Sequence, residues 1–286
     1  VNATVRPGAN RVKTQFVVEN PRLWWPNGLG EPALYPLAVE TPDETLEQEI
    51  GLRTIEVVNE KDEYGISMLF RVNGFDVFAK GADWIPADAF PERQTPEVLD
   101  DLLESARLAN MNMLRVWGGG QYEFEEFYRL CDRKGLMVWQ DMMFSCSLYP
   151  STETFINNVK TELSHQIPRL RHHACLALWC GDNELARMVA ELDPARMFWP
   201  SSPCGGPGNF NDGWHDDSCG DMHYWEVWHG AKDFSAYYAV KPRFCSEFGY
   251  QSFPSLETVE KFCPPDQRNV FSPVMDHHQK CDKGNA

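Results

Sequence analysis

Two glutamates follow apolar runs of the sequence at points where other polar side chains gather. Glu184 ends the stretch LALWCGDNE, which begins with the apolar run Leu176 to Cys180, and Glu247 stands within RFCSEFG. Two carboxylates across a pocket can hydrolyse a glycosidic bond, because one protonates the leaving oxygen while the other attacks the anomeric carbon or activates water. At a separation of roughly 5–5.5 Å the reaction would retain the anomeric configuration through a covalent intermediate.

A cation and an amide near these acids suit the same chemistry. Arg115 could keep Glu247 ionised, and Asn183 could hold a sugar hydroxyl. The other interpretation of Glu184 is structural: it would be a first-turn glutamate beside the positive end of a helix, with Asp182 or Asn183 as the N-cap. The spacing alone leaves both interpretations open.

The elements that must position these residues alternate between strand and helix from about residue 65 onward. Apolar runs that predict strands are followed by segments with leucines and aromatics at helical spacing, such as 95–111, where Thr95 is the predicted N-cap. Pro168 should kink or interrupt the helix at 154–173. The predicted strands are 77–86, 113–120, 136–141, 175–184, 198–203, 221–228 and 243–249, and the predicted helices are 95–111, 122–135, 154–173 and 256–263.

Strands that are continuous apolar runs indicate a parallel sheet covered by helices. Seven of them without a glycine-rich phosphate loop favour a (β/α)₈ TIM-type barrel over a doubly wound sheet. An eighth strand is not evident after 271–280. Residues 1–60 predict a small β-sandwich segment with strands at 12–19, 33–40 and 49–58, and residues 61–286 predict the barrel.

The active site of such a barrel lies at the carboxyl ends of its strands. Polar groups concentrated there are costly unless they have a function. Beyond Glu184 and Glu247, the predicted strand ends present Asp83 and Trp84, Gln140, Asp182, Ser201 and Ser202, Trp225 and Ser246. The predicted substrate-binding residues are Arg115, Trp117, Asp141, Asn183, His223, Tyr224 and Trp228.

Charge and aromatic content restrict the class of partner. The formal net charge is −16, which argues against binding to nucleic acid and to anionic membrane surfaces, whereas neutral substrates remain compatible. The chain has 10 Trp, 9 Tyr and 17 Phe. As single residues these aromatics fit core packing equally well, but as a set they suggest a pocket with platforms for sugar rings.

The cysteines predict neither a disulfide framework nor a metal centre. Their count of nine is odd and no C-x-x-C pair occurs, which fits free thiols in a reducing, cytoplasmic compartment. Cys204, His215, Asp216, Cys219 and His223 lie close together in the sequence, but their spacing matches no zinc pattern well, and a glycine-rich loop over the barrel mouth is the preferred interpretation. No metal or cofactor is predicted.

Several of these stretches together resemble a known family. WCGDNE, RFCSEFGYQSFPSLE, PRLWWPNGLGEPALYPL, RVWGGGQYE, VWQDMMF, FWPSSPCGGPG and FSPVMDHHQK are similar to the retaining β-mannosidases of glycoside hydrolase family 2. The resemblance implies that Glu184 is the acid/base, preceded by the characteristic Asn183, and that Glu247 is the nucleophile. It also implies that Arg115 is the strand-two arginine of related barrels and that Trp117 contacts the sugar.

The same resemblance implies an immunoglobulin-like first segment and a terminal non-reducing β-D-mannose as the substrate, with no cofactor. Two departures from the family stand out: only thirteen residues separate Glu184 from FWPSSP, and 185–197 contain no tryptophan. These departures suggest a fragment or a trimmed form. The alternatives are another exo-acting family 2 glycosidase, of the β-glucuronidase or β-galactosidase type, and a catalytically silent sugar-binding fragment; the VWGGG motif favours mannose.

Overall fold

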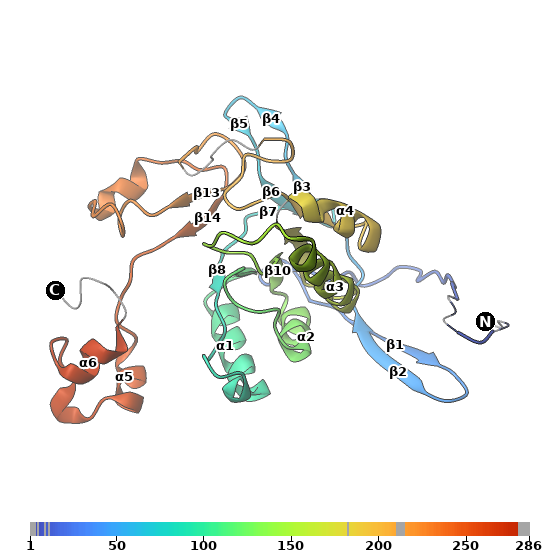
Figure 1. The fold of residues 1–286 in the computed structure, drawn as a ribbon, viewed down its shortest axis with the longest axis horizontal. Helices are drawn as coiled ribbons and strands as arrows, with labels where there is room; N and C mark the ends of the chain where they lie inside the picture. Colours follow the sequence, from blue (N-terminus) through green and yellow to red (C-terminus); the bar gives the residue numbers. More distant parts are fainter. Residues whose placement is uncertain are drawn as a thin grey trace. The chain divides into compact units, whose positions relative to one another are not determined.

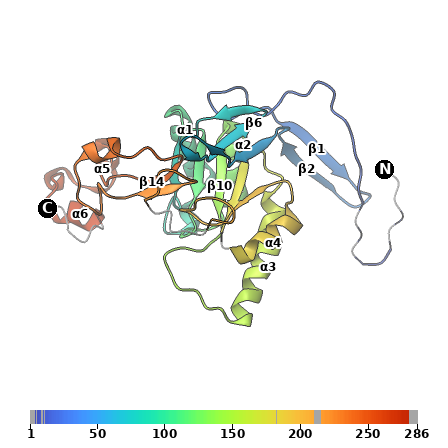
Figure 2. The same ribbon diagram turned by 90° about the horizontal axis from the view of Figure 1, so that it is seen from above.

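Two compact units make up the protein. A computed structural model describes residues 4, 6–8, 10, 12–181, 183–209 and 215–279, with the backbone alone at 183 and 184. The first unit comprises Val1–Tyr224 and Tyr238–Glu247, and the second comprises Trp225–Tyr237 and Phe248–Ala286. Each unit is described by itself (Figures 1 and 2).

A five-stranded parallel sheet forms the centre of the first unit. Its strands follow the order β12-β11-β10-β9-β8, and every pair of neighbours is parallel. All residues of β9, β10 and β11 are buried, as the continuous apolar runs predicted. The strands are β8 (Gly81–Trp84), β9 (Met113–Val116), β10 (Met137–Asp141), β11 (Leu176–Cys180) and β12 (Met197–Trp199).

The last two predicted strands form a sheet of their own. β13 (Met222–Tyr224) pairs with β14 (Cys245–Phe248), and the two arrows lie beside each other in Figure 1. Within the described ranges, no ladder joins this pair to either edge of the five-stranded sheet. All seven predicted strands therefore exist, in an α/β arrangement whose parallel sheet contains five of them.

The four predicted helices are present, and the structure adds α4 (Asn183–Leu192) and α6 (Pro273–His278). In α1 (Pro96–Leu108) the Thr95 hydroxyl accepts a hydrogen bond from the Val98 N–H, and α2 (Glu125–Lys134) ends at Gly135, whose φ of 70° is left-handed. The remaining helices are α3 (Glu153–Leu170), α5 (Leu256–Phe262) and the 3₁₀ turns η1 (Pro91–Arg93), η2 (Phe234–Tyr238) and η3 (Pro265–Gln267). Figures 1 and 2 both show α3 and α4 side by side.

Pro168 does not interrupt α3, and this expectation is corrected. The helix runs through Pro168 and ends at Leu170. Because Pro168 lies in the last turn, its missing N–H removes one hydrogen bond near the helix end, where few further bonds depend on it.

The N-terminal segment contains short antiparallel sheets. β1 (Tyr35–Glu40) and β2 (Thr45–Ile50) form one hairpin, and β3 (Ile55–Val58) pairs with β6 (Leu69–Val72), which pairs with β7 (Phe75–Val77). A smaller hairpin joins β4 (Lys61–Asp62) to β5 (Gly65–Ile66). Because β3 and β6 lie on opposite sides of residue 60, their ladder crosses the predicted domain boundary.

Two strand predictions in this segment are wrong in detail. Residues 12–19 form no strand: Phe16 is 63% exposed and Val17 is 87% exposed, so the apolar residues there have no packed surface to meet. The predicted strand 49–58 is two strands with a break at Gly51, where a Cβ would come within 2.5 Å of the Ala174 side chain. At this point the chain turns onto the sheet, and Arg53 Nε donates to the Ala174 carbonyl at 3.0 Å.

Tryptophans occupy the middle of the core. Trp24, Trp139, Trp179 and Trp199 have no more than 1% of their surface exposed, and they belong to one apolar cluster of the first unit. Trp24 also donates through Nε1 to the Asp132 carbonyl at 2.7 Å, which ties the N-terminal segment to α2. In the described part of the chain, no helix combines the length and the apolarity that a membrane crossing requires.

Candidate active site

Arg115 gathers carboxylates from three strands at the edge where the parallel strands end. Its Nη1 lies 2.7 Å from Glu247 Oε1 and 3.4 Å from Asp83 Oδ1, and its Nη2 lies 2.8 Å from Asp141 Oδ2. The register explains part of this cluster, because Asp83 on β8 is paired directly with Arg115 on β9. Glu247 joins the cluster from β14, which belongs to the separate β13–β14 sheet, and it lies beside Arg115 as the sequence analysis expected.

The cluster contains three carboxyl groups and one guanidinium, and the pKa values of its members are shifted. Burial alone would lower the pKa of Arg115, but Asp141 and Asp83 raise it above its ordinary value, so the guanidinium stays charged. Burial raises the pKa of Asp83 to about 7; Glu247 and Asp141 raise it further, and Arg115 opposes them. Asp83 is therefore partly protonated near neutral pH, and Arg115 is left to stabilise Glu247 and Asp141.

Asp141 holds Arg115 and the loop after β9. Its Oδ1 accepts from Trp139 Nε1 at 2.8 Å, and its Oδ2 accepts from the Gly118 N–H at 3.1 Å as well as from Arg115. The carboxylate is buried, and burial raises its pKa against the opposing effect of Arg115. These contacts show Asp141 supporting the site, and its predicted contact with a sugar stays a prediction.

Trp117 and the glycines after it form a tight turn beside Asp141. A Cβ on Gly119 would lie 2.0 Å from the Trp117 ring, and a Cβ on Gly118 would lie 2.5 Å from the Phe144 carbonyl oxygen. The glycines therefore let the backbone pass close to the indole of Trp117 and to the Phe144 carbonyl. Contact of Trp117 with a sugar stays a prediction.

His223 meets the second oxygen of Glu247. Its Nδ1 lies 3.2 Å from Glu247 Oε2, and its Nε2 lies 3.0 Å from Ser202 Oγ. Burial lowers the pKa of His223 to about 4; Glu247 opposes this shift, and Arg115 adds to it. His223 is therefore neutral at neutral pH, and its observed partner is the carboxylate of Glu247.

Asn183 and Glu184, Tyr224 and Trp228 lie in three different parts of the structure. Asn183 and Glu184 lie in the first turn of α4, directly after β11, but their side chains, like all of Asp182, lie outside the described residues. Tyr224 is buried at the end of β13. Trp228 belongs to the second unit, where its ring meets Tyr250 edge-on at 5.1 Å.

One buried acid beneath the site was missed from the sequence. Asp221 lies directly before β13, and its Oδ1 accepts from Trp199 Nε1 at 2.8 Å and from the Cys204 N–H at 2.9 Å. Its Oδ2 lies 2.7 Å from Ser202 Oγ. The signal that could have found it is an acid at the start of the apolar run DMHY, which a buried strand tolerates only with partners.

The residues that raised the possibility of a metal have other partners. Asp216 accepts from the Ser218 hydroxyl and from Cys219 Sγ, and His223 faces Glu247 and Ser202. Over the ranges the structure describes, the groups with the geometry for a metal are Glu125, His172 and His173, and Asp132, His173 and Cys175. None of these is a predicted site residue. His173 is buried, with its Nδ1 2.6 Å from Asp132 Oδ2 and its Nε2 3.1 Å from Glu125 Oε1.

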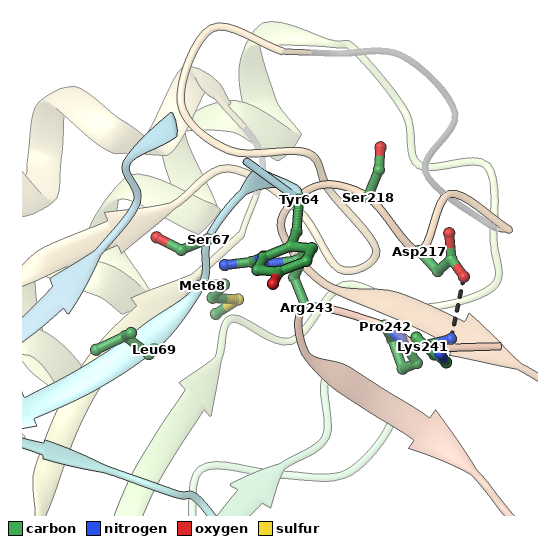
Figure 3. A pocket seen from close by; sticks show the side chains of 9 residues that line it. All are labelled: Tyr64, Ser67, Met68, Leu69, Asp217, Ser218, Lys241, Pro242 and Arg243. Carbon is green, nitrogen blue, oxygen red and sulfur yellow. Dashed lines mark hydrogen bonds between the residues drawn. The ribbon is translucent and has the colours of Figure 1, made fainter. Parts of the chain in front are cut away.

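A hollow lined by residues of the first unit contains none of the predicted site residues. It has a volume of about 430 Å³ and is lined by the β4–β5 hairpin end together with Asp217, Ser218 and Lys241 to Arg243 (Figure 3). Arg243 lies over the Tyr64 ring at 6.0 Å and pairs with Asp62. Among the described residues that line this hollow, Asp217 is the one acid, so they do not provide the carboxylate pair of a glycosidase.

The chain is similar to known glycosyl hydrolases. The pattern described as "Glycosyl hydrolases family 2" matches residues 1–53. The chain is 35% identical to "Beta-mannosidase B" of Emericella nidulans over 96% of its length and 35% identical to "Beta-mannosidase" of Capra hircus over its whole length. A solved β-D-mannosidase from Dictyoglomus thermophilum shares 41% identity with a TM-score of 0.85 over 94% of the chain.

The chain belongs to glycoside hydrolase family 2. It spans 37% of each of the two curated relatives and 36% of the solved structure, a little over a third of their lengths. In this family 2 chain, Glu247 and Arg115 are the parts of the predicted catalytic apparatus that the structure places together.

Proposed function

We propose that this family 2 chain carries the active site of a retaining exo-β-mannosidase, which removes terminal non-reducing β-D-mannose from β-D-mannosides. The observation that carries the proposal is the ion pair between Arg115 and Glu247 at 2.7 Å, at the edge where the strands end. The names of the relatives, at 35 to 41% identity, support mannose as the sugar.

In the proposed double displacement Glu247 attacks the anomeric carbon, and Glu184 protonates the leaving oxygen. Arg115 stabilises Glu247 as an anion before the attack and holds its Oε1 in a fixed direction. Glu184 then acts as a base toward water, which releases mannose with its configuration retained. Asn183, Trp117, Asp141, His223, Tyr224 and Trp228 are proposed to orient the sugar.

The proposal extends to the fold and the cell. We place the parallel strands in a (β/α)₈ barrel that occupies 61–286, preceded by an immunoglobulin-like segment at 1–60. The five parallel strands in chain order, with helices after β8, β9, β10 and β11, support the barrel. The free cysteines, which are mostly buried, favour a reducing, cytoplasmic compartment.

Hydrolysis of aryl glycosides tests the proposal. The full chain should hydrolyse an aryl β-mannoside faster than the β-glucuronide, β-galactoside and β-glucosaminide. Glu247→Gln and Glu184→Gln should each lower kcat by about 10³-fold or more. Glu191→Gln is the matched control, because Glu191 lies on α4 and pairs at the surface with Arg187.

The two glutamates can be told apart by azide and by the product. Azide should restore turnover to Glu184→Ala with a β-mannosyl azide product, and to Glu247→Ala with an α-mannosyl azide product, because it replaces water in the first case and the nucleophile in the second. Activity that survives both substitutions would sink the mechanism. Mannose binding without turnover would favour a silent sugar-binding fragment.

A further inference from the structure

Four side chains in the first unit lie in a row that ends at Glu247, each within hydrogen-bonding distance of the next. Asp221 Oδ2 lies 2.7 Å from Ser202 Oγ, Ser202 Oγ lies 3.0 Å from His223 Nε2, and His223 Nδ1 lies 3.2 Å from Glu247 Oε2. We refer to these four residues as the relay. Its three links join a fully buried acid to the proposed nucleophile.

The number of protons in the relay is fixed by its three links. A hydrogen bond needs one hydrogen, so three links need three hydrogens. The Ser202 hydroxyl supplies one and a neutral His223 supplies one. The third must be carried by Asp221, by Glu247 or by a second protonation of His223.

The surroundings of Asp221 suit a neutral carboxylic acid. Its Oδ1 accepts from two N–H donors, those of Trp199 and Cys204, as a carbonyl oxygen does. Its Oδ2 lies between Ser202 Oγ and Ser246 Oγ, at 2.7 and 2.5 Å. A protonated Oδ2 can donate to Ser202 while it accepts from Ser246, which satisfies every polar atom of the acid.

Electrostatics favour the third proton on Asp221 rather than on His223. Asp221 is fully buried, and burial raises its pKa against the hydrogen bonds that oppose the shift. Among the described residues, the charged and titratable groups that interact with it are Arg115, Cys180, Cys204 and Cys245. His223 faces Glu247 from β14 and Arg115 from β9, and burial lowers its pKa to about 4.

We propose that Asp221 and Ser202 are positioning residues, which fix His223 as the neutral Nδ1–H tautomer that donates to Glu247 Oε2. Ser202 then donates to His223 Nε2, and Asp221 donates to Ser202. With Arg115 on Oε1 and His223 on Oε2, both oxygens of Glu247 are held in place. The role in catalysis rests on the proposed function, whereas the tautomer does not.

The relay has a defined response to rising pH. When Asp221 ionises, Ser202 turns its hydroxyl toward the new carboxylate, and its Oγ can only accept from His223. The hydrogen of His223 then moves to Nε2, so that the lone pair of Nδ1 faces the carboxylate of Glu247. That arrangement is repulsive, and kcat should fall as the pH rises through the range in which Asp221 ionises.

Nitrogen NMR of the ¹⁵N-histidine-labelled full chain reads the tautomer directly, with His223→Gln used to assign the signals. At neutral pH the His223 Nδ1 should show the shift of a protonated nitrogen and Nε2 that of an unprotonated one. Ser202→Ala should abolish this preference, whereas Ser202→Thr, which keeps the hydroxyl, should restore it. An imidazolium signal or an Nε2–H signal at neutral pH in the parent chain would overturn the proposal.

Kinetics on an aryl β-mannoside give the second test. Ser202→Ala should lower kcat by about 10- to 100-fold with little change in KM, because Glu247 loses its fixed orientation. Asp221→Asn cannot ionise and should lose the fall in kcat with rising pH, while Ser246→Ala, which removes a hydrogen bond that lowers the pKa of Asp221, should move the fall to higher pH. An unchanged fall in Asp221→Asn would contradict the relay. A chain without any turnover would instead contradict the proposed function, and the NMR result would still decide the relay.

Discussion

At the scale of single residues, Arg115 determines the charge of the site. One guanidinium lies against Glu247, Asp141 and Asp83, and it is 7% exposed. A lysine would not be equivalent, because Arg115 contacts Glu247 through Nη1 and Asp141 through Nη2 of one rigid planar fork, whereas lysine offers a single compact ammonium on a flexible stem.

Arg115→Lys should therefore lower kcat/KM on a β-mannoside by about 100-fold. Steady-state kinetics measure the loss, and circular dichroism checks that the fold is retained. Arg71→Lys is the control, because Arg71 pairs with Asp76 at the surface. A twofold effect or less at Arg115 would show that its guanidinium geometry is not needed.

Asp83 should make the stability of the protein fall as the pH rises. Its pKa in the folded state is raised to about 7, above the value of about 3.9 in an unfolded chain, so the folded state binds more protons between these values. The stability that Asp83 contributes is therefore fully present below about pH 4 and is lost as the pH rises through about 7. Asp83→Asn should reduce the difference in unfolding free energy between pH 5 and pH 8 by about 2 kcal/mol, a figure discounted because the Asp83 side chain is 29% exposed.

Urea unfolding of the parent and of Asp83→Asn at the two pH values measures this difference. Asp76→Asn serves as a surface control and should behave like the parent. If Asp83→Asn keeps the whole pH dependence of the parent, Asp83 does not hold the proton assigned to it.

At the scale of elements, turns with left-handed backbone fix where helices and strands stop. Gly135 ends α2 at φ 70°, and a Cβ there would lie 2.8 Å from the backbone nitrogen of Asn27. Gly74 closes the β6–β7 hairpin at φ 83°, next to Asn73 at φ 51°, but a Cβ there would meet nothing within 4 Å. Comparing Gly135 with Gly74 therefore separates the cost of a left-handed backbone from the cost of a steric clash.

Gly135→Ala should lower the unfolding free energy by roughly 2–4 kcal/mol, because the left-handed backbone and the clash with Asn27 both cost energy. Gly74→Ala should lose only about 1 kcal/mol, from the backbone alone. Urea denaturation of the two variants compares them. Equal losses would mean that the contact between α2 and the Asn27 turn does not constrain the end of the helix.

At the scale of the whole molecule, the N-terminal segment shares a core with the α/β sheet. Trp24 has none of its surface exposed and donates to the Asp132 carbonyl of α2. Trp24→Ala should therefore lower the unfolding free energy by about 3–5 kcal/mol, and the helices should melt with it. Phe16→Ala is the control, because Phe16 is 63% exposed. If the helices of Trp24→Ala melt as they do in the parent, segment 1–60 folds independently of the α/β sheet.

The sequence was most informative where one local pattern determined one element. The apolar runs of β9, β10 and β11 and the cap at Thr95 predicted these elements, because burial and capping leave direct marks in the sequence. At residues 12–19 a strand-like pattern failed, since a strand also needs a partner and the sequence does not name one. The break at Gly51 depends on contact with Ala174, which is distant in the chain.

The site was predictable in part for the same reason. Glu247 and Arg115 were found because both stand in polar groups at the ends of apolar, strand-like runs, where the active site of a barrel lies. Asp221 was missed because its partners come from Ser202, Ser246 and Trp199, which only the fold brings together. The separate β13–β14 pair could not be foreseen, because apolar runs do not state which strands are neighbours.

The most direct measurement of the central claim is covalent trapping of the nucleophile. The full chain is incubated with a 2-deoxy-2-fluoro-β-mannosyl fluoride, digested with trypsin and analysed by mass spectrometry. The label should lie on Glu247, in the peptide 244–261, and Glu247→Gln should remain unlabelled while Glu191→Gln labels like the parent. A label on any other carboxylate, or mannoside hydrolysis without a trapped intermediate, would contradict the assignment of Glu247 as the nucleophile.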